Sequence, residues 1–231
     1  PTKPKTTELV QVAYNAKDKD HEFSDVIQAA FFLFEDFEWK QISVSLQKNT
    51  AGLWIGTVPV KPTTAFIGVK FYQGELDHPD LLDNNQDRGY AVALSDAKGK
   101  AVQGAYLAEA AFQMPAIAGG GIFSYYKNQP TALSASYLKG LAEQEFALSG
   151  KQYLRYFHPF MSLQKLALGD AFPAYAKKLI TDALKQKALS DQQLSLFYTY
   201  ASSRLQDKEL TQWIEKRVNI DFPNGATARF I

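Results

Sequence analysis

The stretch DNNQDRGY, Asp83–Tyr90, marks the point at which the sequence changes character. Before it, short segments alternate apolar and polar residues, as β-strands with one buried face do. Soon after it the alternation stops, and from about Tyr106 onward apolar residues recur at helical spacing. The stretch is also the densest polar cluster in the chain. It therefore predicts a boundary between a β half and a helical half, and it is the first candidate for a binding loop.

The β half consists of short segments separated by turns. The turn at 48–52 is typical of a hairpin, because Asn49 or Gly52 can take a positive φ there. The expected strands are Glu8–Val12, Val26–Phe34, Trp39–Leu46, Leu53–Val60, Ala65–Tyr72 and Gly89–Leu94, and 74–82 is expected to be a loop. Because no helical segment separates these strands, we expect an antiparallel, immunoglobulin-like β-sandwich over residues 1–104.

Residues 105–231 are predicted to form a helical domain. The expected helices are Ala105–Gln113, one that starts at 128–131 and ends near Leu148, Lys151–Leu168, Phe172–Lys187, one opened by Ser190 and one opened by Asp207. Pro159 should kink or restart its helix, and Ser190 with Gln193 has the spacing of a capping box. Short loops between amphipathic helices favour loosely tetratricopeptide-like stacking. The predicted fold class is therefore α+β, with two domains divided after residue 104.

The composition excludes several classes of partner and chemistry. Hydrophobic residues make up 46% and charged residues 21%, which is ordinary for a soluble globular protein. The net charge of +1 argues against a nucleic-acid partner. No run of about 18 apolar residues is present, so we expect no membrane-spanning segment. Cysteine is absent, which rules out disulfides and thiol chemistry within these residues.

No motif points to catalysis, a cofactor or a metal. Asp83, Asn85 and Asp87 alternate as the first ligands of a calcium loop do. Arg88 and Leu94, however, occupy the positions at which that motif requires Gly and Glu, so we expect a polar loop that caps a strand. The three histidines lack metal-ligand spacing, and the chain has no nucleophile elbow, phosphate loop or acid–base carboxylate pair.

Two tryptophans are candidates for contacts with sugars. Trp39 and Trp54 both lie on expected strands. A flat indole face can stack on the apolar face of a pyranose ring, but an aromatic residue on a strand more often belongs to the core. The sequence therefore favours a core position for both residues.

Several segments of the β half together resemble a starch-binding type of carbohydrate-binding module. They are Gly52–Val60, Ala65–Gly74, Asp83–Asn85 and Gly89–Tyr90, which match a G-x-W strand, a strand ending in aromatic residues and a D-N-N…Y loop. The resemblance implies glycan contacts from Trp39, Trp54, Tyr72, Asp83, Asn84, Asn85 and Tyr90. Arg88 departs from the pattern, because these modules tend to have a small or polar residue there and a long cation can block an aromatic surface.

The whole chain also resembles the N-terminal region of extracytoplasmic, thioredoxin-like thiol-disulfide oxidoreductases of some Gram-negative bacteria. In that family an immunoglobulin-like β domain and a helical segment precede a Cys-x-x-Cys thioredoxin domain, and Phe222–Gly225 is similar to the link before it. The resemblance implies a periplasmic or otherwise extracytoplasmic location, free or anchored through a removed N-terminal signal. No thioredoxin domain is present in these residues, so we expect a fragment of a longer protein.

Three functions remain open at this point. The first is a non-catalytic region that positions a downstream domain or recruits its protein substrates. The second is a glycan-binding module that uses the aromatic and polar residues named above. The third is a scaffold whose helical stack binds a protein partner along a concave face. All three predict that these residues themselves are not an enzyme.

Overall fold

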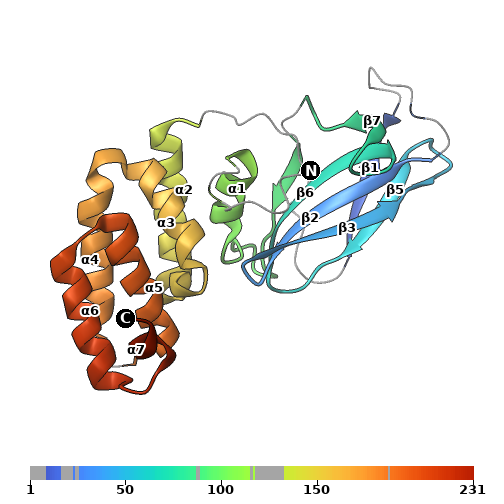
Figure 1. Cartoon of the computed structure of the whole chain (residues 1–231). Helices are drawn as coiled ribbons and strands as arrows, with labels where there is room; N and C mark the ends of the chain where they lie inside the picture. Colours follow the sequence, from blue (N-terminus) through green and yellow to red (C-terminus); the bar gives the residue numbers. More distant parts are fainter. Residues whose placement is uncertain are drawn as a thin grey trace. The chain divides into compact units, whose positions relative to one another are not determined.

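The computed structural model describes residues 9–16, 23, 26–86, 89–114, 117, 133–186 and 188–231 (Figure 1). Antiparallel strands come first and helices follow, which confirms the predicted α+β class. The expected helix start at 128–131 and the expected effect of Arg88 both lie outside the described residues.

The described residues of the β half form eight strands. They are β1 (Leu9–Tyr14), β2 (Gln28–Glu35), β3 (Glu38–Ser45), β4 (Gln47–Lys48), β5 (Trp54–Pro59), β6 (Thr64–Gly74), β7 (Pro79–Asp83) and β8 (Tyr90–Ala93). The predicted hairpin turn between β4 and β5 is present, and Gly52 takes a φ of 83° there. The Asn49 side chain stabilises this turn by accepting hydrogen bonds from the N–H groups of Ala51 and Leu53.

The strands form two antiparallel sheets. The small sheet has the order β1-β5-β4. The larger sheet has the order β3-β2-β6-β7, and β8 also pairs with β6. The chain crosses from β3 to β4 at Leu46, whose N–H donates to the Ile27 carbonyl at 2.8 Å. This crossing links the sheets along one side, and β1 is the edge of the small sheet on the other side.

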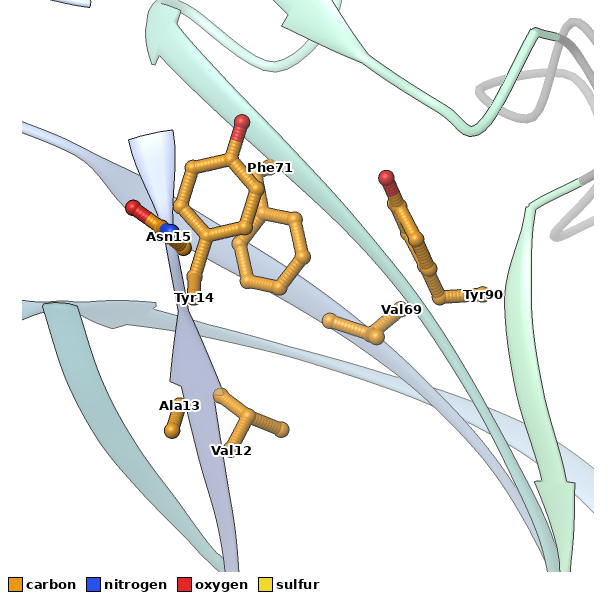
Figure 2. Close-up of a pocket in the computed structure, with 7 residues that line it drawn as sticks. All are labelled: Val12, Ala13, Tyr14, Asn15, Val69, Phe71 and Tyr90. Atoms are coloured by element: carbon orange, nitrogen blue, oxygen red, sulfur yellow. The ribbon is translucent and has the colours of Figure 1, made fainter. Parts of the chain in front are cut away.

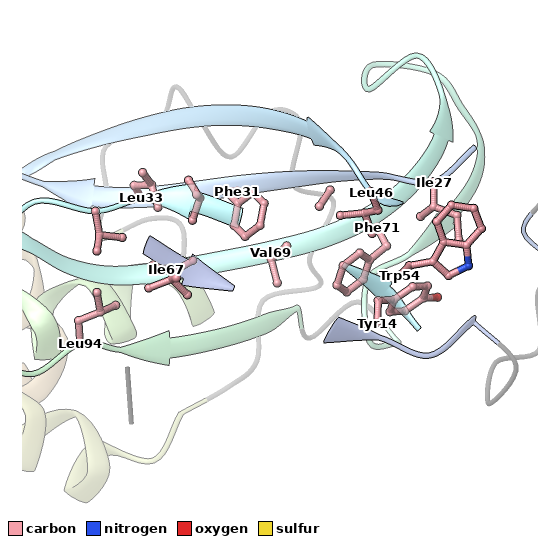
Figure 3. Close-up of a cluster of buried hydrophobic side chains, with 14 residues drawn as sticks. Tyr14, Ile27, Phe31, Leu33, Leu46, Trp54, Ile67, Val69, Phe71 and Leu94 are labelled. Atoms are coloured by element: carbon pink, nitrogen blue, oxygen red, sulfur yellow. The ribbon is translucent and has the colours of Figure 1, made fainter. Parts of the chain in front are cut away.

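An apolar core fills the space between the two sheets (Figure 3). Because side chains alternate along a strand, Phe31 and Leu33 of β2 point into this core beside Ile67 of β6. The small sheet contributes Val10, Tyr14, Trp54 and Val58. Trp54 is only 7% exposed, so this tryptophan lies in the core.

The other face of the larger sheet carries the first helix, α1 (Ala105–Gln113). The ring of Phe112 lies against Phe66, with the ring centroids 5.2 Å apart. At Gly68, a Cβ atom would come within 2.2 Å of the same Phe112 ring. Residue 68 must therefore be glycine for α1 to lie this close to β6.

The helical half continues after α1 with further α-helices and short helical turns. The α-helices are α2 (Ala135–Ser149), α3 (Phe157–Leu168), α4 (Phe172–Leu184), α5 (Asp191–Thr199), α6 (Lys208–Asp221) and α7 (Ala226–Phe230). The 3₁₀-helices are η4 (Gly150–Tyr156) and η5 (Gly169–Ala171), and η6 (Tyr200–Leu205) is a π-helix.

The helix signals in the sequence are confirmed at three positions. Ser190 and Gln193 form both hydrogen bonds of a capping box at the start of α5. Asp207 caps α6 by accepting from the Leu210 N–H at 3.0 Å. Pro159 lies in the first turn of α3, just after the 3₁₀ segment ends, so the helix restarts where a proline is tolerated.

One prediction about the β half is wrong: β7 occupies residues that the sequence indicated as a loop. Pro79 stands at the first position of this edge strand, where a missing N–H does no harm. The pairing of β7 with β6 shifts register between Gln73 and Gly74, and Gly74 takes a φ of 87°. Because a bulge of this kind interrupts the regular pairing, the sequence here lacks the alternation of apolar and polar residues that would predict a strand.

Two compact units divide the chain within α3, between Leu163 and Gln164. The first unit contains both sheets together with α1 and α2, and the second contains α4 to α7. The predicted boundary after residue 104 coincides with the change from strands to helices. The boundary between the two compact units lies further along the chain, because α1 packs on β6 and α2 packs on α1.

Candidate functional site

Asp83 is the centre of a hydrogen-bond cluster drawn from three strands. Its carboxylate accepts from the Tyr14 hydroxyl at 2.8 Å and from the Tyr90 hydroxyl at 3.1 Å. It also accepts from the backbone N–H of Asn85 at 3.0 Å. Asp83 and Asn84 are both buried. The end of β7 is thereby tied to β1 in the other sheet and to β8.

The turn after Asp83 has an unusual backbone. Asn85 and Gln86 both have a positive φ, 49° and 56°, and Gly89 has a φ of 71°. Asparagine tolerates this left-handed region better than most residues. The Asn85 side chain donates to the Gly89 carbonyl at 3.0 Å, and the Gly89 N–H donates to the Asn84 carbonyl at 2.9 Å. The DNN sequence therefore folds a tight, internally bonded turn, as the loop-capping prediction requires.

A cleft of about 450 Å³ lies next to this cluster, between β1 and the strands β6 and β8 (Figure 2). Its lining residues are Val12, Ala13, Tyr14, Asn15, Val69, Phe71 and Tyr90. The Tyr14 ring stacks on Phe71 with centroids 3.9 Å apart, and the Tyr90 ring meets Phe71 edge-on at 5.6 Å. None of the described lining residues carries a formal charge, so this part of the cleft suits an uncharged ligand with an apolar surface.

Burial and the adjacent carboxylate determine the protonation of Tyr14. Burial raises the pKa of the Tyr14 hydroxyl, and the hydrogen bond to Asp83 raises it further, well above its usual range. The hydroxyl therefore stays protonated at neutral pH and donates a hydrogen bond to the Asp83 carboxylate. Figure 2 shows Tyr14 and Tyr90 on either side of Phe71, and the hydroxyls of both tyrosines donate to Asp83.

The seven residues implied by the carbohydrate-binding resemblance do not gather at one place. Asp83, Asn84, Asn85 and Tyr90 lie together around the turn. The remaining three, Trp39, Tyr72 and Trp54, lie elsewhere.

Trp39 and Tyr72 are on the face of the larger sheet opposite the core, because they pair with Phe34 and Gln28 of β2. Trp39 packs against the Phe34 and Phe66 rings, and the Tyr72 hydroxyl donates to Gln28 at 3.0 Å. Trp54, in contrast, is a core residue.

Tyr90 is the one described lining residue of the cleft that the sequence indicated, and Tyr14 and Phe71 are among those that it did not. Tyr14 precedes Asp83 by 69 positions, and no local pattern links the two residues. Their contact depends on the pairing of β1 with β5 and on the packing of one sheet against the other. A buried tyrosine near a buried carboxylate becomes visible only when the tertiary structure is known.

Two further buried carboxylates have donors of their own. Glu35 accepts from the Lys40 ammonium at 2.6 Å, the Lys61 ammonium at 2.9 Å and the Thr64 hydroxyl at 3.0 Å. Glu145 of α2 accepts from the Gly104 N–H at 2.9 Å and the Leu107 N–H at 3.3 Å, at the start of α1. The Ser149 and Tyr156 hydroxyls also donate to Glu145. Both carboxylates therefore stabilise the fold.

Comparisons with known proteins leave the family of this chain open. No family model, no curated protein and no solved structure matches it. Across the described part of the chain, no three acidic or histidine side chains gather where they could hold one metal ion. Of the described helices, none is long and apolar enough to cross a bilayer.

Proposed function

We propose that these residues form a non-catalytic support and recruiting region of an extracytoplasmic thioredoxin-like thiol-disulfide oxidoreductase. The observation that carries the proposal is the packing of α1 between the larger sheet and α2, within the first compact unit. Glu145 of α2 caps the N-terminus of α1, while α1 places Phe112 directly against Gly68 of the larger sheet. A sheet and helices fixed in this way can hold a neighbouring domain or its substrate in a defined position.

Finer features of the fold belong to the same proposal. We regard the two sheets and their common core as an immunoglobulin-like sandwich, and the helices after α2 as tetratricopeptide-like hairpins. The crossing from β3 to β4 and the antiparallel order of both sheets support the first description. Short connections between α4, α5 and α6 support the second.

The test compares the longer protein with a version that lacks residues 1–231. Reduction of a small disulfide, oxidised glutathione, should change by less than about twofold, because it needs only the redox domain. Reduction of a protein substrate, scrambled ribonuclease, should fall by about tenfold or more, because recruitment raises the effective concentration of substrate. Equal losses for both substrates contradict the proposal, as does a coding sequence that encodes no Cys-x-x-Cys domain after Ile231.

A second candidate function is glycan binding at the cleft. The observation that favours it is the pairing of an aromatic wall, Tyr14, Phe71 and Tyr90, with the polar turn that begins at Asp83. Flat rings beside hydrogen-bonding groups are a common arrangement in sugar sites. This candidate excludes Trp39 and Tyr72, because both lie on the other face of the sheet.

Titration with malto-oligosaccharides tests this second candidate by calorimetry. If it holds, Tyr90→Ala should weaken binding by about tenfold or more, since stacking contributes on the order of 1–3 kcal/mol per ring in comparable contacts. Trp39→Ala is the matched control and should bind like the parent chain. Absence of heat across a panel of glycans rules the candidate out.

A further inference from the structure

The free edges of the two sheets differ sharply in how they are protected. Edge strands normally carry charges, proline or a very short length, because an open edge can pair with another chain. In the larger sheet, β3 carries Glu38 and Lys40, β7 begins with Pro79, and β8 has only four residues. In the small sheet, β4 has only two residues.

β1 has none of these protections. Its sequence, LVQVAY, contains no charge and no proline, and most of its residues favour extended structure. Among the described strands it pairs with β5 alone, and no other described strand lies beside its second edge. Leu9 at its start is 65% exposed.

The open edge of β1 faces the cleft. Four consecutive residues, 12–15, line one side of the cleft. Side chains from both faces of β1, and the backbone that joins them, therefore border the cleft. The opposite side is formed by Val69 and Phe71 of β6 and Tyr90 of β8. Figure 2 shows β1 standing apart from β8 across this space. The β3–β4 crossing closes the sandwich on one side, whereas no described strand crosses between the sheets on this side.

We propose that the β1 edge binds an extended, uncharged polypeptide segment as an added strand, whose inward side chains enter the cleft between β1 and β8. An added strand satisfies the N–H and C=O groups that a strand edge presents, and alternate side chains fill the adjacent pocket. The segment is taken to be uncharged, because every described residue that lines the cleft is uncharged and offers no partner to a desolvated charge. This inference deepens the recruiting role proposed above and rests on it.

A peptide titration of the whole 231-residue chain tests the inference. The probe is the acetylated and amidated peptide TVTITVT, and the control is the same peptide with every amide N-methylated, which keeps the side chains and removes the main-chain donors. The unmodified peptide should bind and should slow amide hydrogen exchange in β1 while leaving the β3 edge unchanged. Equal binding of both peptides, or protection of β3 in place of β1, overturns the proposal.

A pair of charge variants locates the contact. Ala13 is exposed and lines the cleft, so Ala13→Lys adds an edge charge without disturbing the core. Thr57→Lys is the matched control, because Thr57 is exposed on β5 and lies outside the cleft. Ala13→Lys should weaken peptide binding by at least about tenfold, and Thr57→Lys by less than about twofold. Equal effects of the two variants overturn the proposal, provided that both melt at the parent temperature.

Two remaining outcomes separate this inference from the proposed function. If sedimentation shows that the chain self-associates and that Ala13→Lys releases monomers that bind no peptide, the occupant of the edge is a second copy and the inference fails. If the peptide does not bind but the longer protein still needs residues 1–231 for protein substrates, the inference fails and the recruiting role stands.

Discussion

Glu35 is a buried carboxylate that three donors keep ionised. Burial by itself would raise the pKa of Glu35, but hydrogen bonds from Lys40, Lys61 and Thr64 outweigh burial and lower the pKa from 4.5 to about 2. The folded-state pKa is below the unfolded value, so the charged form stabilises the fold above about pH 4.5. That contribution is lost as the pH falls through the folded pKa of about 2, and it amounts to at most about 3 kcal/mol.

We therefore expect Glu35→Gln to lower the free energy of unfolding at neutral pH by about 1–3 kcal/mol. The difference from the parent chain should shrink as the pH is lowered below about 4.5, and urea unfolding over that pH range measures it. Glu38→Gln is the control, because Glu38 is exposed on the neighbouring strand. A constant difference between Glu35→Gln and the parent across the range contradicts this account.

Gly68 is the point of closest approach between α1 and the larger sheet. A methyl group there would come within 2.2 Å of the Phe112 ring, so Gly68→Ala must displace the ring or the helix. We expect a loss of about 1–3 kcal/mol in the free energy of unfolding, measured by urea denaturation.

Gly140→Ala is the matched control for Gly68→Ala. Gly140 lies within α2, where a Cβ atom meets nothing closer than 4.0 Å. Alanine should stabilise that helix by about 0.5–1 kcal/mol. Destabilisation of similar size in both variants would show that the Phe112 contact is not the cause.

At the scale of elements, the β2–β3 hairpin tip connects the larger sheet to the helices. The two turn residues, Asp36 and Phe37, both have a positive φ, 53° and 66°, where glycine or asparagine is usual. The Phe37 ring stacks on Tyr156 with centroids 4.2 Å apart, and the Arg155 guanidinium lies 5.0 Å from the same ring. The packing of one ring therefore offsets the backbone strain of the turn.

This balance predicts an unusual order of stability. Phe37→Ala removes the ring but keeps the left-handed strain, so it should lower the free energy of unfolding by about 1–3 kcal/mol. Phe37→Gly removes the ring and the strain together, so it should be less damaging than Phe37→Ala by about 1 kcal/mol. Urea unfolding ranks the two variants, and a glycine variant that is less stable than the alanine variant contradicts the strain argument.

At the scale of the whole molecule, the division within α3 predicts two units that open separately. Ile214 of α6 is fully buried in the second unit, Gln164–Ile231. We expect Ile214→Ala to cost about 2–5 kcal/mol and to speed amide exchange in α4 to α6. Amides of β2 and β6 in the first unit should exchange at the parent rate. Faster exchange in both units to the same extent would show a single cooperative unit.

The order of the elements was predictable from sequence because apolar periodicity and helix caps are local signals. Ser190, Asp207 and Gly52 each act through neighbours within four positions, and the structure has all three as expected. The π-helix η6 and the short helix α7 had no such signal. β7 was missed because its register depends on a bulge in a strand that is already paired.

The candidate site was predictable only in part. The DNN turn has a local composition that identifies it, whereas Tyr14 reaches Asp83 only through the packing of two sheets. Trp39 and Tyr72 were grouped with Asp83 because the resemblance to a carbohydrate-binding module implied glycan contacts from all three. Their face is determined by the register of β2 against β3 and β6, which a single sequence does not contain.

The Glu145 cap has a consequence for the order in which the chain can fold during synthesis. Glu145 follows Gly104 by 41 positions, so the start of α1 has no side-chain cap until most of α2 has left the ribosome. The two sheets need no residue after Leu94 to pair and can form earlier. The face of the larger sheet that α1 covers would therefore stay exposed until Glu145 has been synthesised. Chaperone binding to nascent chains should accordingly peak between the emergence of β8 and that of α2.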